Sequence, residues 1–400
     1  MPVNLNAIPD SLPKQKKGNF WLWLGFLILS VALGVLGTLI YSVFYNLSNF
    51  WFICFSIIFP VSIWMFCFFY NLYIRFCNDI YIENWNIDCE IERQELIEFA
   101  RRGLYVLSHS LETHHGKQGS GVGVANNKVL LSSMPVVSGR KSIAYSSLAI
   151  PESLLGNYIE QRLKAKFDEW KLEYQTIFNR LSPKLNIHVR LFIDSEPSID
   201  NLEDIWTQTL GKLIKPTSFE IKNPKNSTLF TESWLDHRDH DSDLLIVIAG
   251  HLFQIPSENE GEFLSFMLFA GEEAINDPCL SDFRESAIKV YRSEQTQTLE
   301  ETIDKALLWG DGKDKDYDGI WTSFISEDQN KAVLNHLNII DFKPNNFFSV
   351  DNSIGKSGNC ALWLATGLAI EQALDSKNKQ FILIGQPELT ASVVAYPQLS

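Results

Sequence analysis

The feature that most constrains this chain is a long stretch without charge near its amino terminus. Residues 19–74 contain no Asp, Glu, Lys, Arg or His. One helical crossing of a bilayer needs roughly 20 apolar residues, so this stretch is about twice as long as one crossing requires. A short polar segment at residues 45–49 divides it. The sequence therefore predicts two transmembrane helices, at residues 19–44 and 50–74, joined by a tight turn.

Two details of the apolar stretch support a membrane hairpin. Pro60 lies inside the second helix, where neighbouring helices can satisfy the carbonyl that a proline leaves free. Tyrosines and tryptophans gather towards the helix ends, as interfacial aromatic residues do: Trp21, Trp23, Tyr41, Tyr45, Trp51, Tyr70 and Tyr73. A cleaved signal peptide fits poorly, because the first apolar run is too long and a second one follows at once.

Basic residues flank the hairpin on both sides and are missing from its turn. Three lysines precede the first helix and four arginines follow the second: Lys14, Lys16, Lys17, Arg75, Arg93, Arg101 and Arg102. Since positively charged flanks stay in the cytoplasm, we expect both chain ends and the whole soluble part to be cytoplasmic, with residues 19–76 in the lipid bilayer.

The soluble part is acidic. Residues 1–77 hold four of the 34 basic side chains and one of the 48 acidic ones, so a net charge near −17 falls on the rest. Such a charge disfavours nucleic acid and anionic membrane surfaces as partners. The six cysteines show no paired spacing, so we expect free thiols in a reducing compartment.

Apolar runs and helical periodicities alternate after the hairpin. Helices are predicted at residues 90–102, 151–181, 202–214, 299–308, 327–337 and 360–374. Strands are predicted at residues 187–193, 244–250, 263–270, 320–324, 347–350, 381–384 and 391–395, and a further apolar run lies at residues 129–137. Strands that alternate with helices indicate a layered α/β fold.

The predicted organisation has four parts. A cytoplasmic tail (1–18) precedes the transmembrane hairpin (19–76), and two soluble α/β domains follow, at residues 77–215 and 216–400.

An acidic segment at residues 314–319 begins like a calcium-binding loop. Asp314, Asp316 and Asp318 place carboxylates at alternate positions before a glycine. The twelfth position, which should be a bidentate Glu, is Ile325. A solvated acidic loop is therefore the better interpretation, and the three aspartates are weak metal candidates.

A second polar segment places two histidines three residues apart among four carboxylates, at residues 236–243. His237 and His240 could bind zinc if a third ligand came from elsewhere. Arg238 between them raises the electrostatic cost. A polar loop that leads into the following strand is the favoured interpretation.

Phosphate-binding patterns are incomplete. Gly355-Lys356-Ser357 resembles the end of a phosphate-binding loop, but the glycine required five residues earlier is Val350. Residues 119–123 are rich in glycine without the strand–turn–helix frame of a dinucleotide site, so they are predicted to be a flexible loop. No cofactor is expected.

The last 150 residues resemble the carboxyl-terminal half of the thiolase and ketoacyl-synthase fold. The resemblance rests on residues 261–274, on the loop at residues 349–361 and on the closing segments 381–386 and 391–395. It implies two pseudo-repeated halves.

The catalytic residues of that family are missing from the sequence. No cysteine lies between Cys89 and Cys279, although the family places a nucleophile there. Lys356 stands where the family has a catalytic histidine, and residues 321–324 lack the second one. Thioester chemistry needs a nucleophile and donors for the developing oxyanion, so the sequence predicts a scaffold without catalysis.

The overall layout is similar to that of the adaptor proteins for lipase effectors of bacterial type VI secretion systems. The similarity lies in the membrane hairpin, the size, and the surroundings of residues 244–250 and 355–361. It implies a protein of the bacterial inner membrane that binds a phospholipase effector in the cytoplasm and delivers it to the secreted spike.

Two alternatives stay open. One is an enzyme acting on an acyl or lipid substrate, with Cys360 as the candidate nucleophile; a cysteine there is more often a small core residue. The other is an immunity protein against a lipase toxin, which the cytoplasmic orientation disfavours.

Overall fold

The computed structural model describes residues 3–15, 18–45, 48–136, 142–150, 158–284, 287–311, 317–386 and 388–396. The chain forms two compact units. We call residues 4–96 the hairpin, and residues 97–400 together with residues 1–3 the body.

Between Phe20 and Ile74 the described residues of the hairpin are helical, apart from Tyr45 and Ser48. It contains α1 (Phe20–Phe44), α2 (Asn49–Ile53), a π-helical turn η2 (Cys54–Ile58) and the start of α3 (Phe59–Ala100). The segments Phe20–Phe44 and Asn49–Ala100 are long and apolar enough to cross a membrane. Their most apolar windows are only 6% and 11% buried, whereas the core helix of a soluble domain would be mostly buried.

Contacts between the two long helices show that they run antiparallel. The indole Nε1 of Trp64 donates a hydrogen bond to the backbone oxygen of Trp23 at 2.9 Å. Further along, a Cβ on Gly34 would lie 2.4 Å from Cγ of Pro60, so only glycine permits this approach. Pro60 cannot donate a backbone hydrogen bond, and the chain accommodates it with the π-helical turn that ends two residues earlier.

The body is built around a ten-stranded mixed sheet with two halves. The first half contains β1 (Gly103–Glu112), β4 (Ile187–Glu196), β5 (Ser218–Ile221), β6 (Leu244–Phe253) and β8 (Phe263–Ala270). The second half contains β9 (Ile288–Tyr291), β10 (Tyr317–Ser323), β11 (Asn346–Ser349), β12 (Lys379–Ile384) and β13 (Thr390–Ala395). A small sheet is formed by β2 (Ser133–Pro135), β3 (Ser142–Ser146) and β7 (Glu260–Gly261).

The two halves of the large sheet have the same topology. From the edge inwards the orders are β5-β4-β6-β8-β1 and β11-β10-β12-β13-β9. In each half the first two pairs are parallel and the next two are antiparallel. The halves meet where β1 pairs with β9. The predicted layered α/β body with two repeated halves is confirmed by this order.

The helices follow the same repeat. They are α4 (Ser120–Ala125), α5 (Ile159–Arg180), α6 (Leu202–Gln208), α7 (Phe230–Leu235), α8 (Ser281–Arg284), α9 (Leu299–Trp309), α10 (Glu327–Ile339), α11 (Val350–Ser353) and α12 (Ala361–Ser376). Short 3-10 helices are η1 (Leu5–Ala7), η3 (Leu210–Lys212), η4 (Pro224–Asn226), η5 (Arg238–Ser242), η6 (Ala274–Asn276), η7 (Pro278–Leu280) and η8 (Gly358–Cys360). In chain order α5, α6 and α7 of the first half correspond to α9, α10 and α12 of the second.

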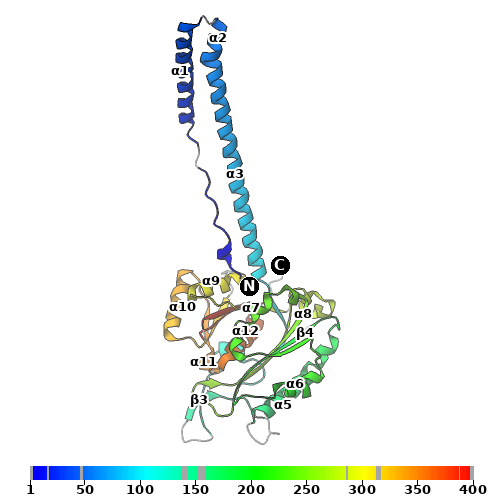
Figure 1. The fold of residues 1–400 in the computed structure, drawn as a ribbon. Helices are drawn as coiled ribbons and strands as arrows, with labels where there is room; N and C mark the ends of the chain where they lie inside the picture. The colour runs from blue at the N-terminus through cyan, green and yellow to red at the C-terminus, as the bar shows by residue number, and fades with distance from the viewer. Residues whose placement is uncertain are drawn as a thin grey trace. The chain divides into compact units, whose positions relative to one another are not determined.

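Three hydrophobic cores define the layers. The central core combines α7 and α12 with strands of both halves. One outer core packs α5 and α6 on the first half, and the other packs α9 and α10 on the second. Figure 1 shows α12 between these two outer helix pairs. Every residue of β6 is buried, because its side chains alternate between the central core and the first outer core; this explains its continuous apolar sequence.

Several elements differ from the sequence predictions. The predicted helices 50–74 and 90–102 belong to one uninterrupted helical segment, Asn49–Ala100, which consists of α2, η2 and α3. Residues 120–123 of the predicted loop 119–123 lie in α4, where a Cβ on Gly121 would lie 2.2 Å from the backbone oxygen of Leu368. Residues 151–157 of the predicted helix 151–181 lie outside the described residues. The domain boundary predicted at residue 215 falls inside the first half of the sheet, which ends with β8.

Candidate functional site

Polar side chains gather at both ends of the parallel strands β4 and β6 in the first half of the sheet. Strands β4 and β6 pair in register over ten residues, from Ile187 with Leu244 to Glu196 with Phe253. At the amino ends lie His188, His240 and Asp243, which we call the histidine cluster. At the carboxyl ends Asp194 pairs directly with His251.

The histidine cluster converges on one carboxylate oxygen. The Oδ2 atom of Asp243 lies 3.1 Å from Nε2 of His188 and 3.1 Å from Nδ1 of His240. The other oxygen, Oδ1, accepts a hydrogen bond from the amide of Asn186 at 2.9 Å. The three ligand atoms lie within 4.8 Å of one another. Two imidazoles and a carboxylate in such proximity are a donor set that suits a divalent transition metal.

Neighbouring side chains fix the orientation of both histidines. The ring of Trp234 on α7 stacks on His240 with 3.7 Å between centroids and 8° between planes. Nδ1 of His188 lies 2.7 Å from Oγ of Ser218 on β5. Burial lowers the pKa of His188, against the opposing effect of Asp243, and so favours the neutral imidazole that a metal ligand requires.

The structure separates the metal candidates of the sequence. His240 belongs to the histidine cluster, whereas His237 is exposed, with its ring centroid 6.0 Å from that of His240. Asp318 lies in β10, where its Oδ2 accepts a hydrogen bond from Gln372 at 2.7 Å. Asp314 and Asp316 lie outside the described residues. Sequence reasoning named neither His188 nor Asp243 as a ligand. Asp243 is one of the four carboxylates of the segment 236–243, and His188 lies in a strand with polar alternation.

The carboxyl-end cluster is an internal ion network. His251 is 8% exposed; its Nε2 lies 3.0 Å from Oε1 of Glu260 and its Nδ1 lies 3.6 Å from Oδ2 of Asp194. The backbone and side-chain nitrogens of Asn359 donate to the same Asp194 oxygen at 2.7 and 3.0 Å. Gly358 precedes it with a φ of +57°, and a Cβ there would lie 2.3 Å from Asp194.

This network fixes the charge of His251. Burial by itself would lower the pKa of His251, but the negative charges of Asp194 and Glu260 and the hydrogen bond to Glu260 raise it to about 9. The imidazole is therefore a cation at neutral pH and cannot act as a general base there. Nearby, Cys360 is fully buried, its thiol donates to the backbone oxygen of Phe192 at 3.2 Å, and burial raises its pKa.

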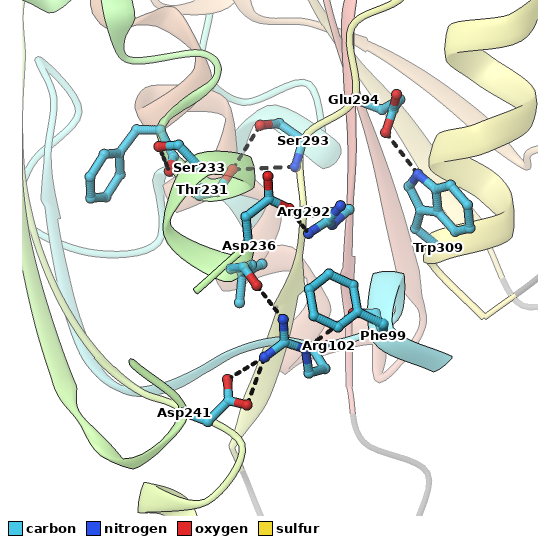
Figure 2. Close-up of polar contacts among 12 residues, drawn as sticks. Phe99, Arg102, Thr231, Ser233, Asp236, Asp241, Arg292, Ser293, Glu294 and Trp309 are labelled. Carbon is cyan, nitrogen blue, oxygen red and sulfur yellow. Dashed lines mark hydrogen bonds and ion pairs between the residues drawn. The ribbon is translucent and has the colours of Figure 1, made fainter. Parts of the chain in front are cut away.

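A third polar network joins the two halves of the body (Figure 2). Oγ1 of Thr231 on α7 lies 2.7 Å from Oγ of Ser293, which follows β9. The fully buried Arg292 donates from Nη2 to Oδ1 of Asp236 at 2.9 Å. Arg102 donates from Nη1 to both oxygens of Asp241, at 2.7 and 2.6 Å.

Aromatic side chains complete this network. The guanidinium carbon of Arg102 lies 4.0 Å from the centroid of the Phe99 ring, and that of Arg292 lies 5.8 Å from it. The indole of Trp309 on α9 donates to Oε2 of Glu294 at 2.8 Å. These contacts tie α7 of the first half to β9 and α9 of the second.

No protein-family model matches the sequence, and no curated protein matches it. The body is similar in chain path to several solved structures. A β-ketoacyl synthase from Burkholderia phymatum has 8% identity and a TM-score of 0.48, covering 74% of this chain and 100% of its own. The peroxisomal 3-ketoacyl-CoA thiolase of Saccharomyces cerevisiae has 8% identity and a TM-score of 0.45, covering 74% and 98%. The human mitochondrial 3-ketoacyl-CoA thiolase has 10% identity and a TM-score of 0.44, covering 74% and 99%.

The charge of His251 makes the stability of the body depend on pH. Its pKa rises from 6.5 to about 9 on folding, so the network contributes fully below pH 6.5 and is lost as pH rises through 9. The full contribution is about 3 kcal/mol. We expect His251→Gln to lower the Tm strongly at pH 7 and much less at pH 10, measured by thermal unfolding in detergent. The variant His237→Gln, at an exposed position, serves as control. If His251→Gln lowered the Tm by the same amount at pH 7 and at pH 10, the raised pKa of His251 would be contradicted.

Removing the partner of Arg292 should destabilise the body severely. Asp236→Ala leaves a guanidinium with 0% side-chain exposure without its carboxylate, which typically costs about 3–5 kcal/mol. The matched control is Asp328→Ala, whose pair with Lys331 is 97% and 71% exposed and should contribute at most about 1 kcal/mol. The measurement is the Tm of each variant at pH 7; equal values for the two would refute a structural role for the pair.

Proposed function

We propose that this chain is a membrane-tethered, non-catalytic adaptor that binds a protein partner through its body. The observation that carries the proposal is that the reactive side chains at the carboxyl ends of β4 and β6 are bonded to other groups of the body. The Cys360 thiol is buried and bonded to a backbone oxygen, and His251 is held as a cation between two carboxylates. Both observations count against the alternative of an acyl or lipid enzyme with Cys360 as nucleophile.

The class of partner comes from the resemblance of the sequence to type VI secretion adaptors. We propose a phospholipase effector as cargo and a component of the secreted spike as its destination. The acidic charge of the chain, −14 overall, suits a basic partner surface. Edge strands β5 and β11 carry exposed apolar side chains, with Ile221 44% and Phe347 49% exposed. Such edges can accept a further strand from a partner.

Co-purification tests the adaptor proposal. We expect the tagged full chain, extracted from its host in mild detergent, to retain a phospholipase in near-equal amount. The variants Ile221→Lys and Phe347→Lys map the edge strands, with Leu172→Lys, exposed on α5, as control. An edge variant should reduce the bound phospholipase at least tenfold while the control retains it. If the purified chain carries no phospholipase or spike component, the proposal is refuted.

We further propose that the hairpin crosses the bacterial inner membrane twice, with both chain ends in the cytoplasm. The support is the length and apolarity of α1 and of the segment Asn49–Ala100, together with the basic flanks. Alkaline phosphatase inserted between Ser48 and Asn49 should be active, and a fluorescent protein fused after Ser400 should fluoresce. If alkaline phosphatase fused at the carboxyl terminus were active, the proposed orientation would be wrong. If carbonate washing released the chain from membranes, the proposal that the hairpin crosses the bilayer would be wrong.

A further inference from the structure

The histidine cluster has the geometry of a metal centre. In a tetrahedral zinc site the metal–ligand distances are about 2.0–2.2 Å, so neighbouring ligand atoms lie about 3.3 Å apart. The two distances from the Asp243 oxygen to the histidine nitrogens are both 3.1 Å. All three ligand atoms lie within 4.8 Å of one another, so an ion can be held among them once the two histidine nitrogens have closed on it.

The three ligands come from rigid and separate parts of the first half. His188 is the second residue of β4, Asp243 immediately precedes β6, and His240 lies in η5. The side chains of His188 and Asp243 are 12% and 6% exposed, whereas that of His240 is 26% exposed. Two ligands are thus held by the sheet, and the third faces the side from which solvent and an ion can approach.

Each ligand is supported by a further contact, as is usual around metal sites. Ser218 contacts the ring nitrogen of His188 that does not face Asp243, and Asn186 holds the second oxygen of Asp243. Trp234 covers the face of the His240 ring. With Ser218 accepting from Nδ1–H of His188, the Nε2 lone pair is free for a metal.

The guanidinium of Arg190, which contacts Ser218 beside the cluster, is already paired with a carboxylate. Arg190 donates from Nη1 to Oγ of Ser218 at 2.9 Å, and its Nη2 lies 3.0 Å from Oε1 of Glu220. Its charge is therefore offset by a carboxylate, and the carboxylate of Asp243 is left to face the two imidazoles.

We propose that His188, His240 and Asp243 bind one divalent transition metal ion of the zinc type, with Nε2, Nδ1 and Oδ2 as ligand atoms and solvent at the fourth position. The ion would clamp η5 to the amino ends of β4 and β6. This inference is independent of the adaptor function.

Metal titration of the full chain in detergent tests the site. After treatment with a chelator, Zn²⁺ is titrated against a chromophoric competitor, and Co²⁺ is added separately as a spectroscopic probe. We expect one Zn²⁺ per chain, a raised Tm and an intense visible Co²⁺ spectrum typical of four-coordinate binding. His240→Ala should weaken Zn²⁺ binding at least a hundredfold, and Ser218→Ala by about 10–100-fold, as for other supporting residues.

The matched control is His237→Ala, since His237 is exposed and only three residues from His240. This variant should bind Zn²⁺ as the unmodified chain does. Absence of stoichiometric Zn²⁺ binding by the unmodified chain would overturn the proposal. So would equal losses in His237→Ala and His240→Ala, because they would indicate an adventitious surface site. The Co²⁺ spectrum of the unmodified chain keeps the test decisive even if a variant fails to fold.

Discussion

The burial of α12 is the constraint on which the rest of the body depends. All residues from Ala361 to Ala373 are buried, so this helix has no face for solvent and must be enclosed on every side. One half of the sheet can cover only one side of a helix. The second, topologically equivalent half supplies the other side, and the pairing of β1 with β9 holds the two halves together around the helix.

The polar clusters follow from this enclosure. With both faces of the sheet covered by helices, polar side chains on β4 and β6 reach solvent only at the strand ends. At the amino ends these side chains contact residues of η5, and at the carboxyl ends they contact residues of the segment before α12. The network around Arg292 lies where α7 and β9 meet, and its charges are paired because the protein interior penalises an isolated one.

The sequence predicted the elements whose apolar pattern is unbroken. Strands β6 and β8 and helix α12 are predominantly apolar and buried, and their predicted ranges agree with the structure to within a few residues. The long apolar helices of the hairpin were predicted for the same reason. The two strands that join the halves were missed, since β1 carries Ser108, His109 and Ser110 in its middle and β9 has only four residues. Ser110 is tolerated because it accepts a hydrogen bond from the indole of Trp170 at 3.2 Å.

The candidate site was less predictable than the fold, for a physical reason. His240 and Asp243 are near in sequence, but His188 reaches them only because β4 and β6 are neighbours in the sheet. Periodicity identifies strands without giving their order, so a sequence does not indicate which strand ends meet. His237 and His240 look equivalent in the sequence, and only the course of η5 separates the exposed histidine from the half-buried one.

The position of α12 in the chain has a consequence for biosynthesis. The hairpin leaves the ribosome before the first half of the body, and α12 leaves it only after that half is complete. Until α12 arrives, the strands of the first half present to the surroundings the apolar face that it later covers. A nascent chain of this protein thus exposes apolar surface for much of its synthesis, after its hairpin has left the ribosome. Exposed apolar surface of this kind favours aggregation of the nascent chains until α12 covers it and the body closes.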